Sequence, residues 1–103
     1  CCPSSPRVDT MAEGVATRTT FDLTFNILRR ELDDIMTLTE EELAEGVRVA
    51  VRTTHNLAEG AGAAPVMAAL KMKDSHPYGP AVAVMSGGNL DSRLLSRLFA
   101  RPD

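Results

Sequence analysis

Apolar side chains recur at helical spacing in the first part of the chain. Four of them, at positions i, i+4, i+7 and i+11, would lie along one face of a helix from about Asp22 to Asp33. These four are Phe21, Phe25, Leu28 and Leu32. Thr19 or Thr20 can cap this helix. The segment 34–38 has the length and the β-branched content of a short strand.

A capping box predicts where the second helix begins. Thr39 can accept a hydrogen bond from the first-turn amides, and Glu42 can reach back to the amide of Thr39. The helix that follows would end near His55. Its apolar face is formed by Leu43, Val47, Ala50 and Val51.

The second half of the chain predicts two further helices and one strand. The glycine- and alanine-rich segment 60–70 has almost no side-chain bulk at its start, and Pro65 is tolerated only in the first turn of a helix, so a closely packed helix should begin near Gly62. The prolines, glycine and charges of 71–80 indicate a surface connection, and 80–85 reads as a strand. A last helix carries the apolar face Leu94, Leu95, Leu98 and Phe99.

This order of elements predicts the α/β class, with a partial parallel sheet flanked by helices. Apolar runs such as 81–85 suit strands that are covered on both faces. Two strands alone would leave open edges. We therefore expect the two strands to belong to a larger sheet whose other strands lie outside these residues.

Composition and charge exclude several classes of partner. Among the 103 residues, 44% are hydrophobic, but no apolar run approaches the length of a membrane span. The net charge is −3 and the arginines are scattered, so neither nucleic acid nor a membrane is an expected partner. Cys1 and Cys2 are adjacent, which suits neither a structural disulfide nor a metal site. Residues 1–7 do not resemble a signal peptide and are expected to be a disordered lead-in, or the start of an incomplete chain.

The segment Ser86-Gly87-Gly88-Asn89 is the strongest candidate for a ligand site. It follows a predicted buried strand, and ligands of open α/β sheets bind at the carboxyl ends of strands. The glycines allow a ligand to approach the backbone, and the helix that follows would favour an anion at its N-terminus. The alternative is a tight strand-to-helix turn that happens to contain a serine.

Two more segments give this motif a context. Together with Ala58-Glu59-Gly60-Ala61-Gly62-Ala63 and Met11-Ala12-Glu13-Gly14-Val15, the segment resembles the C-terminal portion of the threonine dehydratase and serine racemase family. The resemblance extends from about Val8 to Phe99. It implies that 8–103 is the C-terminal portion of the catalytic domain of a fold type II enzyme that uses pyridoxal 5'-phosphate.

The resemblance also implies which residues bind this cofactor. Ser86 would hydrogen-bond the pyridine nitrogen, Gly87 would lie beside it, Glu59 would lie beside the ring, and Gly14 would approach through its backbone. Glu59 could instead be a solvated acid or a charge at a helix N-terminus. The chain departs from the commoner family pattern at Glu13, where aspartate is usual, and that departure bears on Gly14.

A serine at this position implies a type of chemistry. A hydroxyl can donate a hydrogen bond to a neutral pyridine nitrogen, whereas a carboxylate would favour the protonated ring. A neutral ring withdraws electron density from the substrate less strongly, so Ser86 favours elimination or racemisation over transamination. Neither His55 nor His76 has a catalytic or metal-ligating partner in the sequence, and Asp33-Asp34 at a helix end is expected to be structural.

The lysine that would form the Schiff base is not among these residues. The chain contains only Lys71 and Lys73, and both follow the third helix. In the family this lysine, the phosphate loop and the metal-binding carboxylates all lie upstream, so no catalytic or metal-binding residue is assigned here.

The predicted function is an ammonia-lyase that converts threonine or serine to a keto acid and ammonia, with 3-hydroxyaspartate as a further candidate substrate. We expect the 103-residue chain alone to be inactive. The resemblance implies a cytoplasmic homo-oligomer with a place in isoleucine biosynthesis. The alternatives are a serine or aspartate racemase of the same family and a non-catalytic α/β fragment or interaction module.

Overall fold

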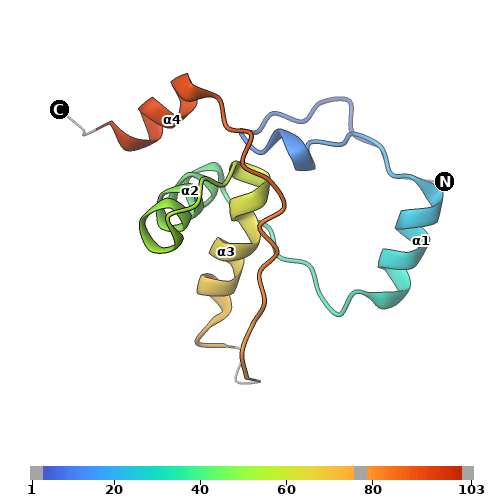
Figure 1. The fold of residues 1–103 in the computed structure, drawn as a ribbon. Helices are drawn as coiled ribbons and strands as arrows, with labels where there is room; N and C mark the ends of the chain where they lie inside the picture. The colour runs from blue at the N-terminus through green and yellow to red at the C-terminus, as the bar shows by residue number, and fades with distance from the viewer. Residues whose placement is uncertain (1–3, 76–78, 101–103) are drawn as a thin grey trace.

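The computed structural model describes residues 4–75 and 79–100, so His76 lies outside the described residues. All four predicted helices are present. The chain forms a short 3-10 helix and then four α-helices: η1 (Glu13–Val15), α1 (Asp22–Glu31), α2 (Glu40–Thr54), α3 (Gly60–Met72) and α4 (Ser92–Phe99). Helices α2 and α3 lie side by side at the centre of the structure (Figure 1).

The capping box of α2 is confirmed. The Thr39 hydroxyl accepts from the Glu42 amide at 3.2 Å, and the Thr39 amide donates to the Glu42 carboxylate at 2.8 Å. The Lys71 ammonium also donates to Glu42, which ties the last turn of α3 to the first turn of α2. The hydrogen bond from Lys71, and to a smaller extent the one from the Thr39 amide, holds the pKa of Glu42 below its usual value. The helix ends at Thr54, and its C-cap residue His55 adopts the left-handed conformation with φ of 57°.

Helix α3 begins at Gly60, two residues before the predicted start. Pro65 therefore lies inside the helix and cannot donate the backbone hydrogen bond that Ala61 would otherwise accept. Small residues let α3 pack closely on α2: a Cβ added at Gly46 would lie 3.1 Å from both the carbonyl oxygen of Ala63 and the Cβ of Met67. The close packing of α2 on α3 compensates for the missing hydrogen bond.

The core is small and lies where α2 meets α3. The side chains of Val47, Ala50, Ala58 and Ala63 are fully buried. Partly buried side chains from both ends of the chain pack against them, and these are Met11, Met85, Leu90 and Leu98. The core therefore joins the helical pair to the segments that carry the candidate site.

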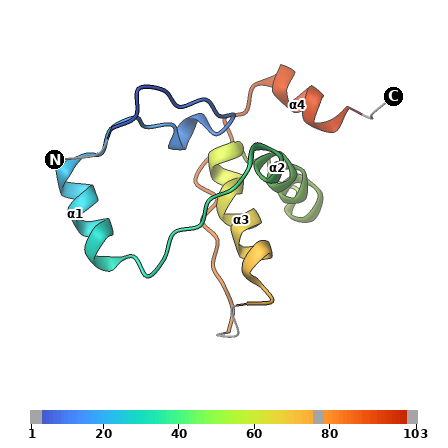
Figure 2. The ribbon, with the colours of Figure 1, turned by 180° about the vertical axis from the view of Figure 1, so that it is seen from behind.

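Helix α1 stands away from the rest of the structure. Figures 1 and 2 show it set apart from α2 and α3, and it packs against no other described helix. The predicted apolar face is exposed, with Phe21 69% and Leu28 49% accessible. The predicted cap is wrong, because Phe21 is the N-cap residue and no side chain caps the helix. The hydroxyl of Thr20 is buried and has no hydrogen-bond partner among the described residues.

Neither predicted strand forms within the described residues. Segments 34–38 and 80–85 are irregular, and the β-bridge within residues 4–75 and 79–100 joins Ser4 to Thr19 instead. A strand requires a neighbour that exchanges backbone hydrogen bonds with it, and neither segment has such a neighbour here. Val82 and Val84 are consequently 91% and 68% exposed. The expected parallel sheet is therefore not built by these residues alone.

Two further findings concern the expected lead-in and the membrane. The Ser5 amide donates to the Arg18 carbonyl at 2.8 Å, so the part of the lead-in that the structure describes lies against the loop before α1. None of the helices within residues 4–75 and 79–100 is long and apolar enough to cross a bilayer.

Candidate functional site

The Ser-Gly-Gly-Asn segment lies against the loop that precedes α3. The Glu59 amide donates to the Gly87 carbonyl at 3.1 Å. A Cβ added at Gly62 would lie 3.1 Å from the Gly87 nitrogen and closer still to its carbonyl oxygen. A Cβ added at Gly88 would collide with the Leu57 carbonyl oxygen. The two segments can approach this closely only because these positions lack side chains.

Three of the four predicted cofactor-binding residues come together here. The Glu59 carboxylate lies against Gly87, where it would collide with an added Cβ, and 3.9 Å from the position of a Cβ added at Gly14. A Cβ at Gly14 would also lie 2.9 Å from the Cβ of Ala61. The partly buried Glu59 side chain forms no hydrogen bond or ion pair with any residue that the structure describes. Its carboxylate is thus available to a ligand placed between these backbones.

Glu40 fixes the segment that leads into Gly14. Its carboxylate accepts from the Met11 amide at 2.9 Å and from the Thr10 hydroxyl. These two hydrogen bonds, with the Met11 amide as the larger cause, hold the pKa of Glu40 below its usual value. The first turn of α2 therefore positions the 10–14 segment against the start of α3.

A polar cleft of about 270 Å³ opens beside these residues. It is bounded by the segment around η1, the start of α3 and the start of α4. Its lining is Met11, Glu13, Glu59, Gly60, Ala61, Asn89, Leu90, Asp91 and Leu94. Segments from both ends of the chain thus enclose one site.

Ser86 is not part of the cleft lining, but the adjacent Gly87 lies against Glu59, which lines the cleft. Ser86 is exposed. Its neighbours fix its position, because Met85 packs against the core and the Gly87 carbonyl accepts a hydrogen bond from the Glu59 amide. Its hydroxyl makes no hydrogen bond within 4–75 and 79–100, which leaves its donor and acceptor capacity for a ligand.

The start of α4 differs from the sequence-based expectation. The Asp91 carboxylate accepts from the amides of Arg93 at 2.9 Å and Leu94 at 3.0 Å. An anionic ligand would have to displace a carboxylate that already satisfies these amides. The expected anion preference of this helix N-terminus is therefore wrong for these two amides.

Asp91 and Leu94 are cleft residues that sequence reasoning missed. An aspartate three residues before the first leucine of an amphipathic helix is an N-cap signal, and that signal would have placed Asp91 at the start of α4. Neither lysine is at the cleft, since Lys71 and Lys73 lie at the far end of α3. The described residues contain no group of three or more His, Cys, Asp or Glu side chains that could hold a metal ion.

Comparison with known proteins identifies the family. The profile described as "Pyridoxal-phosphate dependent enzyme" matches residues 2–87, and the chain therefore belongs to this family. The chain is 35% identical over 96 residues to the L-threonine ammonia-lyase of Geobacter sulfurreducens, covering 93% of this chain and 24% of that protein. It is 35% identical to the L-threonine ammonia-lyase of Thermotoga maritima, covering 87% and 22% respectively.

A solved structure gives the same result. The crystal structure of threonine deaminase from T.th. superposes with a TM-score of 0.77 at 35% identity, covering 87% of this chain and 32% of that one. The predicted resemblance to the threonine dehydratase family is thus confirmed. The chain spans about a quarter of the length of the curated relatives it matches.

The residues present fit part of a site for pyridoxal 5'-phosphate, the cofactor of this family. Gly14 and Gly87 leave backbone without side chains beside the Glu59 carboxylate. Ser86 supplies a hydroxyl that can donate to a ring nitrogen. These groups can contact one edge of a planar cofactor. They include no lysine that could carry it.

Proposed function

We propose that residues 8–103 are the C-terminal portion of the catalytic domain of a pyridoxal-phosphate-dependent ammonia-lyase that acts on threonine or serine. The convergence of Gly14, Glu59 and Gly87 beside Ser86 carries this proposal. The names of the relatives support the reaction and the amino-acid substrate. In the complete fold type II domain, segments 34–38 and 80–85 would join a parallel sheet.

Each residue of the site has a separate role in this proposal. When bound, the cofactor acts as an electron sink for the α-carbon of the amino acid. The Ser86 hydroxyl donates a hydrogen bond to the ring nitrogen and keeps that nitrogen unprotonated, because a hydroxyl does not stabilise a positive charge as a carboxylate does. The backbone at Gly14 and Gly87 admits the ring, and Glu59 borders it. Loss of the β-hydroxyl is thereby favoured over transamination.

The wider setting of the enzyme stays a prediction. A homo-oligomer, a cytoplasmic location and a place in isoleucine biosynthesis follow from the resemblance. Racemisation of serine or aspartate begins with the same loss of the α-proton, so product analysis separates it from elimination. A non-catalytic interaction module would turn over neither amino acid.

The test uses the natural protein that contains this chain, purified at full length. With pyridoxal 5'-phosphate present, L-threonine should yield 2-oxobutanoate and L-serine pyruvate, each with one equivalent of ammonia. Conversion of L-serine to an equal mixture of L-serine and D-serine, without any keto acid, would support the racemase instead. No reaction with any of these amino acids would overturn the proposal. The isolated 103-residue chain should be inactive, since neither Lys71 nor Lys73 is at the site.

A substitution at Ser86 tests its role. Ser86→Asp should lower the rate of elimination about tenfold or more and raise the rate of transamination, because the carboxylate favours the protonated ring. Each tenfold increase in that preference corresponds to a rise of about one in the pKa of the ring nitrogen. Ser96→Asp is the matched control, since Ser96 is an exposed serine on α4 away from the cleft lining. An unchanged product ratio in Ser86→Asp would remove Ser86 from the ring nitrogen.

A further inference from the structure

Helix α4 forms one wall of the cleft and is attached to the rest of the structure through α2 and the small core. Leu94 in its first turn lines the cleft opposite Glu59 and Gly60 at the start of α3. Among the described elements, α4 packs against α2 and against no other helix. Figure 1 shows α4 extending away from the α2–α3 pair toward the C-terminus. The width of the cleft therefore depends on how α4 is attached to α2.

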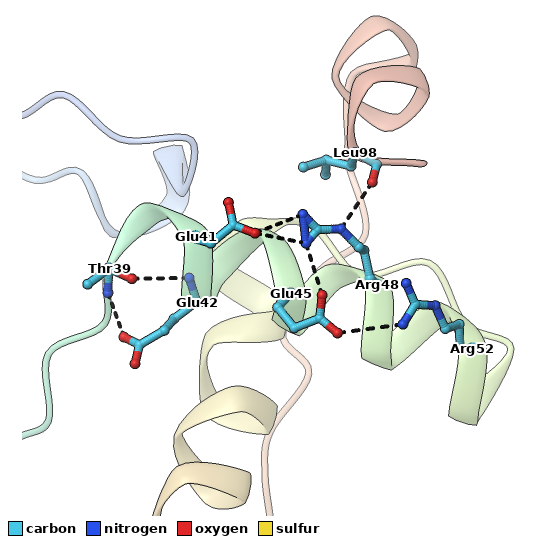
Figure 3. A network of polar contacts seen from close by, with 7 residues as sticks. All are labelled: Thr39, Glu41, Glu42, Glu45, Arg48, Arg52 and Leu98. Carbon is cyan, nitrogen blue, oxygen red and sulfur yellow. Dashed lines mark hydrogen bonds and ion pairs between the residues drawn. The ribbon is translucent and has the colours of Figure 1, made fainter. Parts of the chain in front are cut away.

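Arg48 makes the polar contact that attaches it. Its Nε donates to the Leu98 carbonyl at the end of α4 at 3.1 Å. Its other two nitrogens donate to carboxylates on α2, to Glu45 at 2.9 Å and to Glu41 at 3.1 and 3.2 Å. Figure 3 shows the guanidinium between the two carboxylates and the Leu98 carbonyl. All three nitrogens of the guanidinium are thus engaged.

The side chain of Arg48 is more buried than that of either glutamate it contacts. The Arg48 side chain is 19% exposed, whereas the Arg52 side chain on the next turn is 59% exposed. The two glutamates fix the orientation of the guanidinium, so that Nε points at α4. The Leu98 carbonyl is one of the last four carbonyls of its helix, which have no partner within the helix. A cation at this end also complements the helix dipole.

The contact is transmitted along α4 to the cleft. The Leu98 side chain packs against the buried core, and the helix connects Leu98 rigidly to Leu94 at the cleft. Helix α2, which carries Arg48, is packed on α3, which carries the opposite wall. The two walls are therefore connected through Arg48, and neither wall contains it.

We infer that Arg48 is a positioning residue that holds α4, and with it the α4 wall of the cleft, in place beside the proposed cofactor site. The inference rests on the proposed function in taking the neighbouring group of Gly14, Glu59, Gly87 and Ser86 to bind pyridoxal 5'-phosphate. Arg48 is not among the residues that line the cleft, and it acts through the placement of Leu94 and Asp91.

Hydrogen exchange on the full-length natural protein tests the attachment without any ligand. In Arg48→Met, the amides of 92–99 should exchange about tenfold faster or more, since a hydrogen bond to a charged group contributes enough for that factor. Arg52→Met removes the same charge from the same helix, and Arg52 forms no hydrogen bond or ion pair with α4 in the described residues, so this variant should leave exchange unchanged. Arg48→Lys retains one donor and should restore part of the protection. Equal exchange in all four proteins would overturn the inference.

Cofactor affinity tests whether the attachment matters to the site. The full-length apoprotein is titrated with pyridoxal 5'-phosphate, and Arg48→Met should bind it about tenfold more weakly than Arg52→Met at equal thermal stability. A purely structural role would lower the thermal stability of Arg48→Met and leave its cofactor affinity equal to that of Arg52→Met, which would overturn the inference. If Arg48→Met does not fold, the comparison is made with Arg48→Lys. If the wild-type protein does not bind the cofactor, the proposed function fails, and the exchange result still decides whether Arg48 holds α4.

Discussion

Gly62→Ala tests whether the two glycine-containing segments must touch. Gly62 is in the first turn of α3 and is buried against the Ser-Gly-Gly-Asn segment. The new methyl group would lie 3.1 Å from the nitrogen and 3.3 Å from the carbonyl carbon of Gly87, and nearer still to its oxygen. All three neighbours are backbone atoms, so no side chain can rotate away. The Gly87 backbone must shift, and the hydrogen bond from the Glu59 amide must lengthen.

The magnitude follows from two opposing effects. Replacing glycine by alanine inside a helix is favourable by up to about 1 kcal/mol. Overpacking a close contact costs about 1–3 kcal/mol. Because backbone atoms form the contact, we expect the overpacking to be larger and Gly62→Ala to destabilise the full-length protein by about 1–2 kcal/mol. The affinity for pyridoxal 5'-phosphate should fall as well, because the shift of Gly87 also moves Ser86.

Thermal unfolding and cofactor titration of the full-length protein measure both effects. Gly46→Ala is the matched control: it is also a helical glycine, its nearest neighbours would be at 3.1 Å, and it is away from the cleft. This control should lose less stability and leave cofactor affinity unchanged. If Gly62→Ala were as stable as the wild type or more stable, the close contact with Gly87 would be refuted.

Three further predictions concern α2. His55→Gly should stabilise the full-length protein by about 1 kcal/mol in urea denaturation, because glycine adopts the left-handed conformation without the cost that His55 incurs; a loss of stability would contradict the assigned cap. Thr39→Ala should cost about 1 kcal/mol through loss of the capping box, whereas Thr37→Ala, at an exposed position just before it, should cost nothing measurable. Lys71 and the cap lower the pKa of Glu42, so the stability that this carboxylate contributes is present above its usual value of 4.5 and is lost as the pH falls below that value. Glu42→Gln should remove that part of the pH dependence, and identical pH profiles of the two proteins would show that the ion pair contributes nothing.

The sequence predicts the helices well because caps and apolar spacing involve only residues that are close in sequence. The capping box at Thr39 fixed the start of α2, and apolar spacing located α1 and α4. The prediction places the start of α3 two residues too late, because it confines Pro65 to the first turn of the helix. Tight packing of small residues on α2 outweighed the single lost hydrogen bond.

The strands could not be confirmed for the opposite reason. Segments 34–38 and 80–85 have the composition of strands, but strand formation depends on neighbours distant in sequence. Val82 and Val84 are exposed here, and the larger sheet expected to cover them stays a prediction. Likewise, the meeting of Gly14 with Glu59 joins residues far apart in sequence, and only the resemblance to a family pointed to it.

A crystal structure of the full-length protein with bound pyridoxal 5'-phosphate tests the central claim most directly. We predict that the ring nitrogen lies at about 3 Å from the Ser86 hydroxyl, within hydrogen-bond distance. The ring should border Glu59 and the backbone of Gly14 and Gly87. A cofactor bound elsewhere, with Ser86 out of hydrogen-bond reach of its ring, would contradict the account.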